Sequence, residues 1–110
     1  MRLYQPLLAM LLAASLAGCA KPLPPEKSAY AGQWSGTDIE LQIMADGRVD
    51  YNRVTTNGNT SVKAPIKEFA GDNMVVGVGP MSTTFVVSAP PHQVGDAWKM
   101  TVDGVELTKK

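Results

Sequence analysis

The chain has 110 residues, 45% of them hydrophobic, and its ten Lys and Arg balance ten Asp and Glu, so the formal net charge at pH 7 is zero. This length leaves room for one domain. The balanced charge gives no electrostatic basis for binding nucleic acid or for a polybasic membrane patch, and Lys63, Lys67 and Lys99 are scattered along the sequence. Because there is one cysteine, an intramolecular disulfide is excluded and packing alone has to stabilise the domain.

The first eighteen residues have the pattern of a secretory signal peptide. Arg2 supplies a positive charge, and eleven apolar or small residues follow from Leu7 to Ala17. Such a stretch is too short to span a bilayer, which takes about 20 residues, but it is typical of the hydrophobic region of a signal peptide. We therefore expect residues 1–18 to be removed.

The apolar stretch ends in Leu16-Ala17-Gly18-Cys19, which resembles the lipobox of bacterial lipoproteins. The resemblance implies cleavage between Gly18 and Cys19, a diacylglyceryl group on the Cys19 sulfur and a fatty acyl group such as palmitate on its new α-amine. Two or more chains give stable membrane anchoring where a single chain is marginal. Ala20 stands where many inner-membrane lipoproteins have Asp, so in a Gram-negative host the resemblance implies the periplasmic face of the outer membrane.

Residues 19–29 are expected to form a lipidated tether. Residues 20–29 contain three prolines and no periodic apolar pattern. This composition predicts an extended, semi-rigid spacer that holds the domain off the bilayer. A proline motif that binds a partner is the alternative.

Residues 30–110 are predicted to form one all-β domain. Apolar residues alternate with period two, and clusters of Gly, Asn and Asp interrupt them roughly every 8 to 12 residues. Seven or eight short strands with short connections predict an antiparallel up-and-down meander. Closure into a small barrel is the economical arrangement because it removes exposed edges, and an open sheet folded into a sandwich is the alternative.

Three turns predict strand registers that place apolar residues opposite apolar residues. A type I′ turn at Asp103-Gly104, a three-residue loop at 45–47 with a left-handed glycine, and a two-residue turn at Asn57-Gly58 define the hairpins. Two further strands are expected at about 74–78 and 83–88. The expected pairs are Met100 with Leu107 and Val102 with Val105, Leu41 with Tyr51 and Ile43 with Val49, and Tyr51 with Ala64 and Val49 with Ile66.

An eight-stranded barrel has an interior just wide enough for its own side chains or for one small ligand. Ten large residues of the predicted strands are expected to fill this interior, so we expect it to be packed and dry. They are Trp34, Leu41, Ile43, Tyr51, Ile66, Val76, Phe85, Trp98, Met100 and Leu107.

Gly32-Gln33-Trp34 resembles the G-x-W signature of lipocalins, which closes the bottom of their barrel. The chain is much shorter than a lipocalin and lacks the other lipocalin motifs, so the resemblance is an analogy at the level of the fold. The alternative is a tryptophan that fills one end of a small core, beside a glycine that allows close backbone approach.

The sequence contains no catalytic or metal-binding motif. His92 is the single histidine, so a zinc site or a general base would need carboxylates such as Asp72 or Asp96. Ser82-Thr83-Thr84 lacks the G-x-S-x-G nucleophile elbow, and Gly77-Val78-Gly79-Pro80 lacks the third glycine and the helix of a phosphate-binding loop. We expect no enzyme, no cofactor and no metal.

Two carboxylates, Asp38 and Glu40, are expected on one strand face. The register of the 45–47 loop places Glu40 opposite Asn52 on the side away from the core. A solvated outer face explains this pair without any catalytic role.

Two functions remain open. The first is an envelope lipoprotein without catalysis that binds a protein or polymer partner, with the proline-bounded loop 89–96 or the loop Gly79-Pro80-Met81 as candidate contact positions. The second is a lipocalin-like carrier of a small apolar ligand, which the G-x-W resemblance and the predicted barrel suggest.

Overall fold

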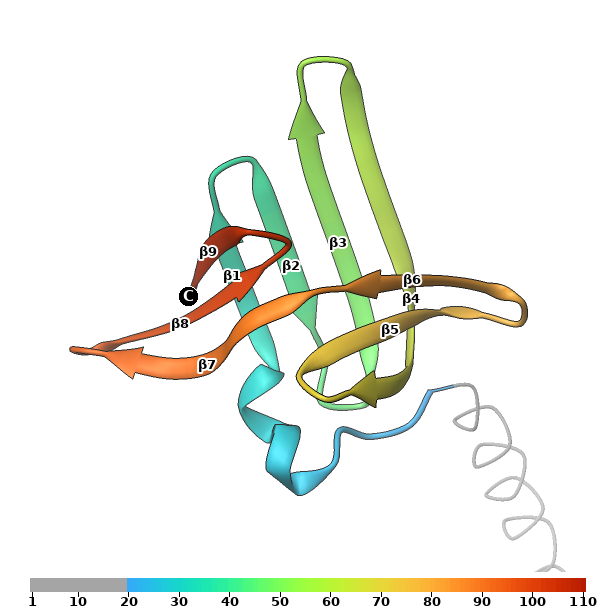
Figure 1. The fold of residues 1–110 in the computed structure, drawn as a ribbon, viewed down its shortest axis with the longest axis horizontal. Helices are drawn as coiled ribbons and strands as arrows, with labels where there is room; N and C mark the ends of the chain where they lie inside the picture. Colours follow the sequence, from blue (N-terminus) through green and yellow to red (C-terminus); the bar gives the residue numbers. More distant parts are fainter. Residues whose placement is uncertain (1–19) are drawn as a thin grey trace, which may run out of the picture.

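The computed structural model describes residues 20–110 (Figure 1). The predicted signal peptide, the lipobox and Cys19 lie outside these residues. In the described part, the helical segment is a six-residue 3-10 helix, η1 (Pro25–Tyr30), and no helix there is long and apolar enough to cross a membrane.

Nine antiparallel strands form one curled sheet in the order β6-β5-β4-β3-β2-β1-β9-β8-β7. Each strand pairs with its neighbours in the chain except at β6 and β7, and β1 also pairs with β9. The all-β, barrel-like meander predicted from the sequence is confirmed, with nine strands in residues 20–110 in place of seven or eight. The strands are β1 (Gly32–Gly36), β2 (Ile39–Ile43), β3 (Arg48–Thr55), β4 (Gly58–Ala70), β5 (Asn73–Val78), β6 (Met81–Phe85), β7 (Val87–Val94), β8 (Ala97–Val102) and β9 (Val105–Lys109).

The extra strand arises because the chain changes its pairing partner at Val86. β6 pairs with β5 and β7 pairs with β8, although the two strands run end to end as one ribbon (Figure 1). The Val86 N–H donates to Asp103 Oδ1 at 2.9 Å, its carbonyl accepts from the Asp103 N–H at 2.8 Å, and the Val87 N–H donates to Asn73 Oδ1 at 2.8 Å. These bonds satisfy backbone groups that the sheet ladders leave without a partner.

The loop predicted over 89–96 is wrong. β7 extends to Val94 and pairs with β8, so the turn is confined to Gly95 and Asp96. Two register irregularities between Val87 and His92 accommodate the prolines at 90 and 91, which cannot donate to a regular ladder.

Two of the three predicted hairpin registers are confirmed. Asp103 and Gly104 both have positive φ, 49° and 82°, as a type I′ turn requires, and the pairs around them are as predicted. Gly47 has φ 94° in the three-residue loop between β2 and β3, whose pairs are also as predicted.

The register predicted at Asn57-Gly58 is wrong by two residues. Thr55 pairs with Gly58, so the turn consists of Thr56 and Asn57, and the Thr55 hydroxyl donates to the Gly58 carbonyl at 2.8 Å. The observed pairs are Tyr51 with Val62 and Val49 with Ala64. A shift of two residues keeps every side chain on its predicted face, which is why the apolar pattern did not distinguish the two registers.

The concave side of the curled sheet holds the hydrophobic core. Nine of the ten predicted interior residues are buried, and Trp98 is half-buried. Trp34, Leu41, Met100 and Leu107 have 0% of their surface exposed. The other buried hydrophobic residues are Tyr30, Ile39, Val49, Met74, Val87 and Val102.

Replacing the buried Phe85 with alanine should lower the free energy of unfolding by about 3–5 kcal/mol, because the ring leaves a cavity beside Tyr51, 4.7 Å away between ring centroids. Urea unfolding of a chain that starts at residue 20 measures this. The control is Met81→Ala, at a side chain that is 74% exposed, which should change the value by less than about 0.5 kcal/mol. Equal losses in the two variants would contradict the assigned core.

Candidate functional site

The segment that follows the proposed anchor lies against the β domain. We call residues 21–30 the docked segment. The Leu23 N–H donates to the Ala45 carbonyl at 3.1 Å, and the Leu23 side chain packs on the core. A β-carbon at Gly47 would collide with the Lys21 carbonyl oxygen, so Lys21 touches the loop between β2 and β3.

The prediction of an extended spacer is wrong from Pro25 onward, because residues 25–30 form η1. Pro25 starts the helix, where its fixed φ suits a helical turn, and Glu26 follows in the first turn. Pro25-Glu26 was a sequence signal for the start of η1. The helix itself is stabilised by contacts with residues that are distant in the sequence.

Tyr30 joins η1 to the core. Its hydroxyl donates to the Asp72 carbonyl at 2.8 Å, and its ring meets Phe69 edge-on with centroids 5.1 Å apart. Its own carbonyl accepts from Trp34 Nε1 at 2.9 Å. η1 therefore covers the end of the core at which Trp34 lies.

Lys27 fixes the outer side of η1. Its Nζ lies 5.4 Å from the ring centroid of Tyr30 and 5.2 Å from that of Phe69, within the range of cation–π attraction. The same Nζ donates to the Gly71 carbonyl at 2.9 Å and lies 3.5 Å from an Asp72 carboxylate oxygen. These contacts tie η1 to the turn between β4 and β5.

Lys109, on the last strand β9, also holds the docked segment against the sheet. Its Nζ lies 5.0 Å from the Trp34 centroid and 5.5 Å from that of Trp98, and it donates to the Ala29 carbonyl at 3.0 Å. Burial lowers the pKa of Lys109 below its usual value. Gly32, with φ 141°, leaves room for this side chain, since a β-carbon there would stand 3.0 Å from Lys109 Cε. The second interpretation of Gly32-Gln33-Trp34 expected close backbone approach at the glycine, whereas the neighbour of Gly32 is the Lys109 side chain.

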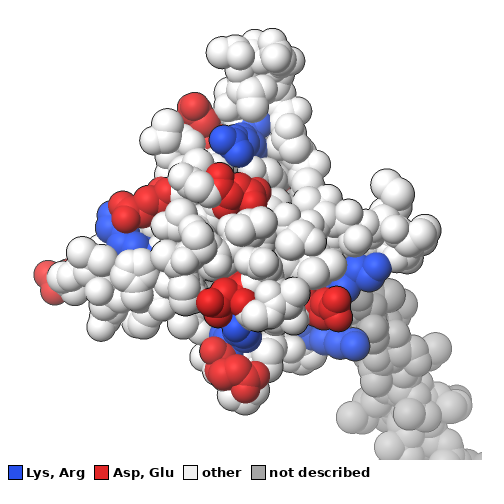
Figure 2. All heavy atoms as spheres, viewed as in Figure 1, with Lys and Arg blue, Asp and Glu red and all other residues white. Residues whose placement is uncertain are grey.

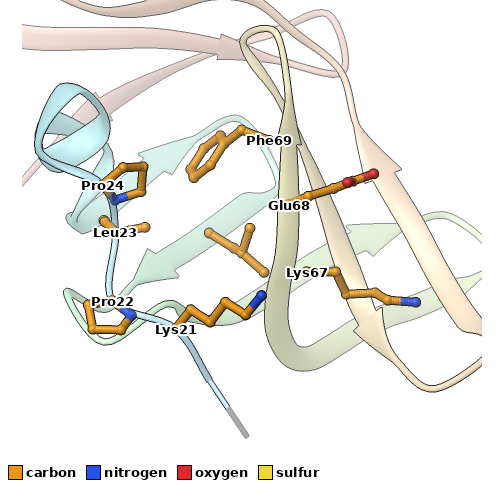
Figure 3. Close-up of a pocket in the computed structure, with 8 residues that line it drawn as sticks. Lys21, Pro22, Leu23, Pro24, Lys67, Glu68 and Phe69 are labelled. Carbon is orange, nitrogen blue, oxygen red and sulfur yellow. The ribbon is translucent and has the colours of Figure 1, made fainter. Parts of the chain in front are cut away.

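A hollow of about 240 Å³ separates the docked segment from β4 (Figure 3). Leu23 and Phe69 face each other across it, whereas Lys67 and Glu68 point away. The buried core residue Ile66 also lines the hollow, and Leu23 and Phe69 pack against the same core.

The structure does not gather the predicted metal or catalytic partners. His92 is exposed on β7, with Nδ1 2.8 Å from the Pro90 carbonyl oxygen. Asp72 lies in the turn between β4 and β5, and Asp96 in the turn between β7 and β8. Within residues 20–110, no three His, Cys, Asp or Glu side chains gather in a group that could hold a metal ion.

The two carboxylates expected on one strand face are separated. Asp38 is an exposed turn residue with φ 63°, a conformation that aspartate tolerates better than most residues. Glu40, on β2, lies opposite Asn52 of β3, as predicted. It accepts from the Ser35 hydroxyl and from Lys110 Nζ, the latter at 3.2 Å, and these bonds hold the pKa of Glu40 below its usual value.

The polar stretch 82–84 and the glycine-containing stretch 77–80 form a strand and a turn of the sheet. Ser82-Thr83-Thr84 lies exposed along β6, and Gly77 through Pro80 end β5 and form the turn. A β-carbon at Gly77 would collide with the Met81 carbonyl oxygen, so glycine is needed there for β5 and β6 to approach.

The first half of β4 has a strand partner on one side only, among the described residues. β4 pairs with β3 from Gly58 to Pro65, but with β5 only from Ile66 onward. The Ile66 N–H donates toward β3, to the Gly47 carbonyl at 2.8 Å. Because backbone groups alternate in direction along a strand, those of residues 59, 61 and 63 point away from β3.

We call residues 59–63 the free β4 edge. It belongs to the β3–β4 hairpin, which projects beyond the rest of the domain (Figure 1). Pro65 marks its end, because by the same alternation its missing N–H would have faced the next strand. The sequence analysis missed this edge, although a proline inside a predicted strand is a known sign of an edge position.

The surface charges are mixed. Lys and Arg alternate with Asp and Glu over the face drawn in Figure 2. Lys63 and Lys67 lie on β4 and Lys99 on β8, which agrees with their predicted scatter. Comparisons of the chain with models of protein families, with curated proteins and with solved structures gave no match.

Removing the Tyr30 hydroxyl with Tyr30→Phe should cost about 0.5–1.5 kcal/mol of stability at pH 7, since one hydrogen bond to Asp72 is lost. Burial, and then the charge of Asp72, raise the pKa of Tyr30 to about 12 from its usual value of 10.0. The neutral phenol therefore stabilises the fold fully below pH 10, and this contribution is lost as the pH rises through 12.

Urea unfolding at a series of alkaline pH values tests this dependence. The parent chain should lose stability between about pH 10 and 12, and the Tyr30→Phe variant should lose less. If stability fell with pH as steeply in Tyr30→Phe as in the parent chain, Tyr30 would not be the group responsible for the loss.

Proposed function

We propose that this protein is a lipoprotein of the bacterial cell envelope, anchored through acylated Cys19, whose β domain binds a protein or polymer partner without catalysis. The anchor is supported by the signal-peptide pattern and by Leu16-Ala17-Gly18-Cys19. In a Gram-negative host, Ala20 after the cysteine favours the periplasmic face of the outer membrane.

The free β4 edge is the observation that carries the partner-binding proposal. Outward N–H and C=O groups on an exposed strand are a template for an added strand, a mode in which main-chain hydrogen bonds give affinity. The edge carries polar or small side chains at residues 59–61 and Lys63, all of them exposed. We propose that an extended segment of the partner pairs with this edge.

The core residues favour a surface site over an interior ligand site. Large side chains such as Trp34, Phe85 and Met100 occupy the concave side and are at most 2% exposed. A lipocalin-like carrier of a small apolar ligand, the second candidate, would need space at these positions. Partner binding by the surface is therefore the preferred proposal.

The anchor is tested by Cys19→Ser in the full chain, with labelled palmitate supplied to the growing cells. The variant should lose the label and leave the detergent-rich phase, because the acylated residue is missing. Ala20→Ser, one position further along, is the control and should keep both properties. Equal labelling of Cys19→Ser and the parent chain would refute the anchor.

The edge is tested by Ser61→Pro, which removes one outward N–H and leaves the inward groups that face β3. Losing this bond should weaken partner recovery by up to about tenfold, the equivalent of roughly 1.4 kcal/mol. Recovery is measured by cross-linking in envelope membranes, and the melting temperature confirms that each variant is folded. Ser61→Ala keeps the N–H and should recover the partner at the parent level.

Two outcomes would contradict this proposal. Equal recovery by the folded Ser61→Pro variant would show that the β4 edge is not the binding surface. Recovery no greater than that of an acylated chain without residues 30–110 would refute partner binding by the β domain altogether.

A further inference from the structure

The docked segment leaves little free chain between the proposed anchor and the β domain. Lys21 touches Gly47, and Leu23 is hydrogen-bonded to Ala45 at 3.1 Å. Only Ala20 therefore separates Cys19 from Lys21, the first residue that contacts the β domain. An extended chain advances at most about 3.6 Å per residue, so the α-carbons of residues 19 and 21 are within about 7 Å of each other.

The position of Lys21 identifies the side of the domain that lies next to this attachment point. Lys21 lines a hollow of about 290 Å³ together with Lys67, Val78 and Gly79. The turn between β5 and β6 therefore adjoins the start of the docked segment. Both lie on the right of Figure 1, whereas the β3–β4 hairpin projects upward and the β7–β8 hairpin lies on the left.

The turn between β5 and β6 has the composition of a membrane-contacting surface. Val78 is 64% exposed and Met81 is 74% exposed, although both are apolar. Lys67 Nζ donates to the Gly79 carbonyl at 2.6 Å, which places an ammonium group beside these side chains. Exposed apolar side chains flanked by lysines suit the boundary between headgroups and acyl chains.

The charge of this region is close to balanced. Lys21 and Lys67 are accompanied by Glu68, the neighbour of Lys67 on β4. Electrostatic attraction alone would therefore be weak, and the short link to the anchor is what brings the surface to the bilayer. The exposed apolar side chains, the weak net charge and the short link to the anchor together favour contact with a phospholipid surface. That surface does not have to be strongly anionic.

We infer that the turn between β5 and β6 rests on the phospholipid surface, with Val78 and Met81 among the headgroups and Lys21 and Lys67 beside their phosphates. This inference rests on the proposed acylation of Cys19. It gives the docked segment the role of fixing the orientation of the domain on the membrane, in place of the spacer role expected from the sequence.

Site-specific fluorescence tests the orientation in the full chain after processing by its host. Cys19 is the single native cysteine, and acylation consumes its thiol, so an introduced cysteine can be labelled alone. The test variant is Val78→Cys, carrying an environment-sensitive nitrobenzoxadiazole. The matched control is Val94→Cys, since Val94 is a valine at the end of β7 with 53% exposure.

The labelled proteins are placed in vesicles of phosphatidylethanolamine and phosphatidylglycerol that contain a lipid with a spin label near its headgroup. We expect the probe at position 78 to be quenched several-fold more strongly than the probe at position 94. Met81→Cys should behave like Val78→Cys, which guards against an effect of one substitution on folding.

The acylation state, read from the mass of the N-terminal peptide of the same samples, separates the possible failures. Equal quenching at positions 78 and 94 in acylated protein would overturn the orientation and leave the proposed anchor standing. Protein without the acyl groups would overturn the proposed anchor and, with it, this inference.

Discussion

The curled sheet depends on the change of strand partner at Val86. Phe85 and Val87 are 2% and 4% exposed on the two sides of Val86, which is 50% exposed, so the inward and outward alternation of side chains continues without interruption. The same extended chain pairs with β5 before Val86 and with β8 after it. A sheet whose first and last strands are consecutive in sequence has to curl, and its concave side then encloses the core.

This continuity explains which parts of the fold could be predicted from the sequence. Alternation through residues 83–88 identified an extended segment correctly, but alternation carries no information about the neighbouring strand. Turns with a positive φ at Gly47 or Gly104 fix a register by local geometry, and those registers were right. At Asn57-Gly58, two registers satisfy the same pattern, and the choice depends on the turn itself.

The docked segment could not be predicted because its contacts join distant parts of the chain. The Tyr30 hydroxyl binds a carbonyl 42 residues away, and Lys109 binds one 80 residues away. Proline content in residues 20–29 was interpreted by composition alone, which favours an extended chain unless a tertiary surface is available. Cys19 differs, because its proposed role depends on a local motif. Pro65 was a local sign of the free β4 edge, but the extent of that edge depends on where the pairing of β4 with β5 begins, which is at Ile66.

Polar residues on the free β4 edge also limit pairing between copies of the chain. Lys63 and Pro65 are features that natural edge strands use against aggregation, since a charge opposes close stacking and a proline interrupts the row of donors. The edge is therefore short and defined at one end, which suits a specific added strand better than an extending sheet.

The placement of η1 has a mechanical consequence. A pulling force between a membrane anchor and a partner held at β4 enters the domain through the docked segment, which is fixed by side-chain contacts and a few hydrogen bonds. β1, by contrast, lies in the middle of the sheet with a ladder on each side. Under tension we expect the docked segment to yield before the sheet does. Its ten residues span at most about 36 Å when fully extended, and the link lengthens by less than this because the folded segment already covers part of that distance. Residues 21–30 are thus expected to extend before a force of this kind separates the strands of the sheet.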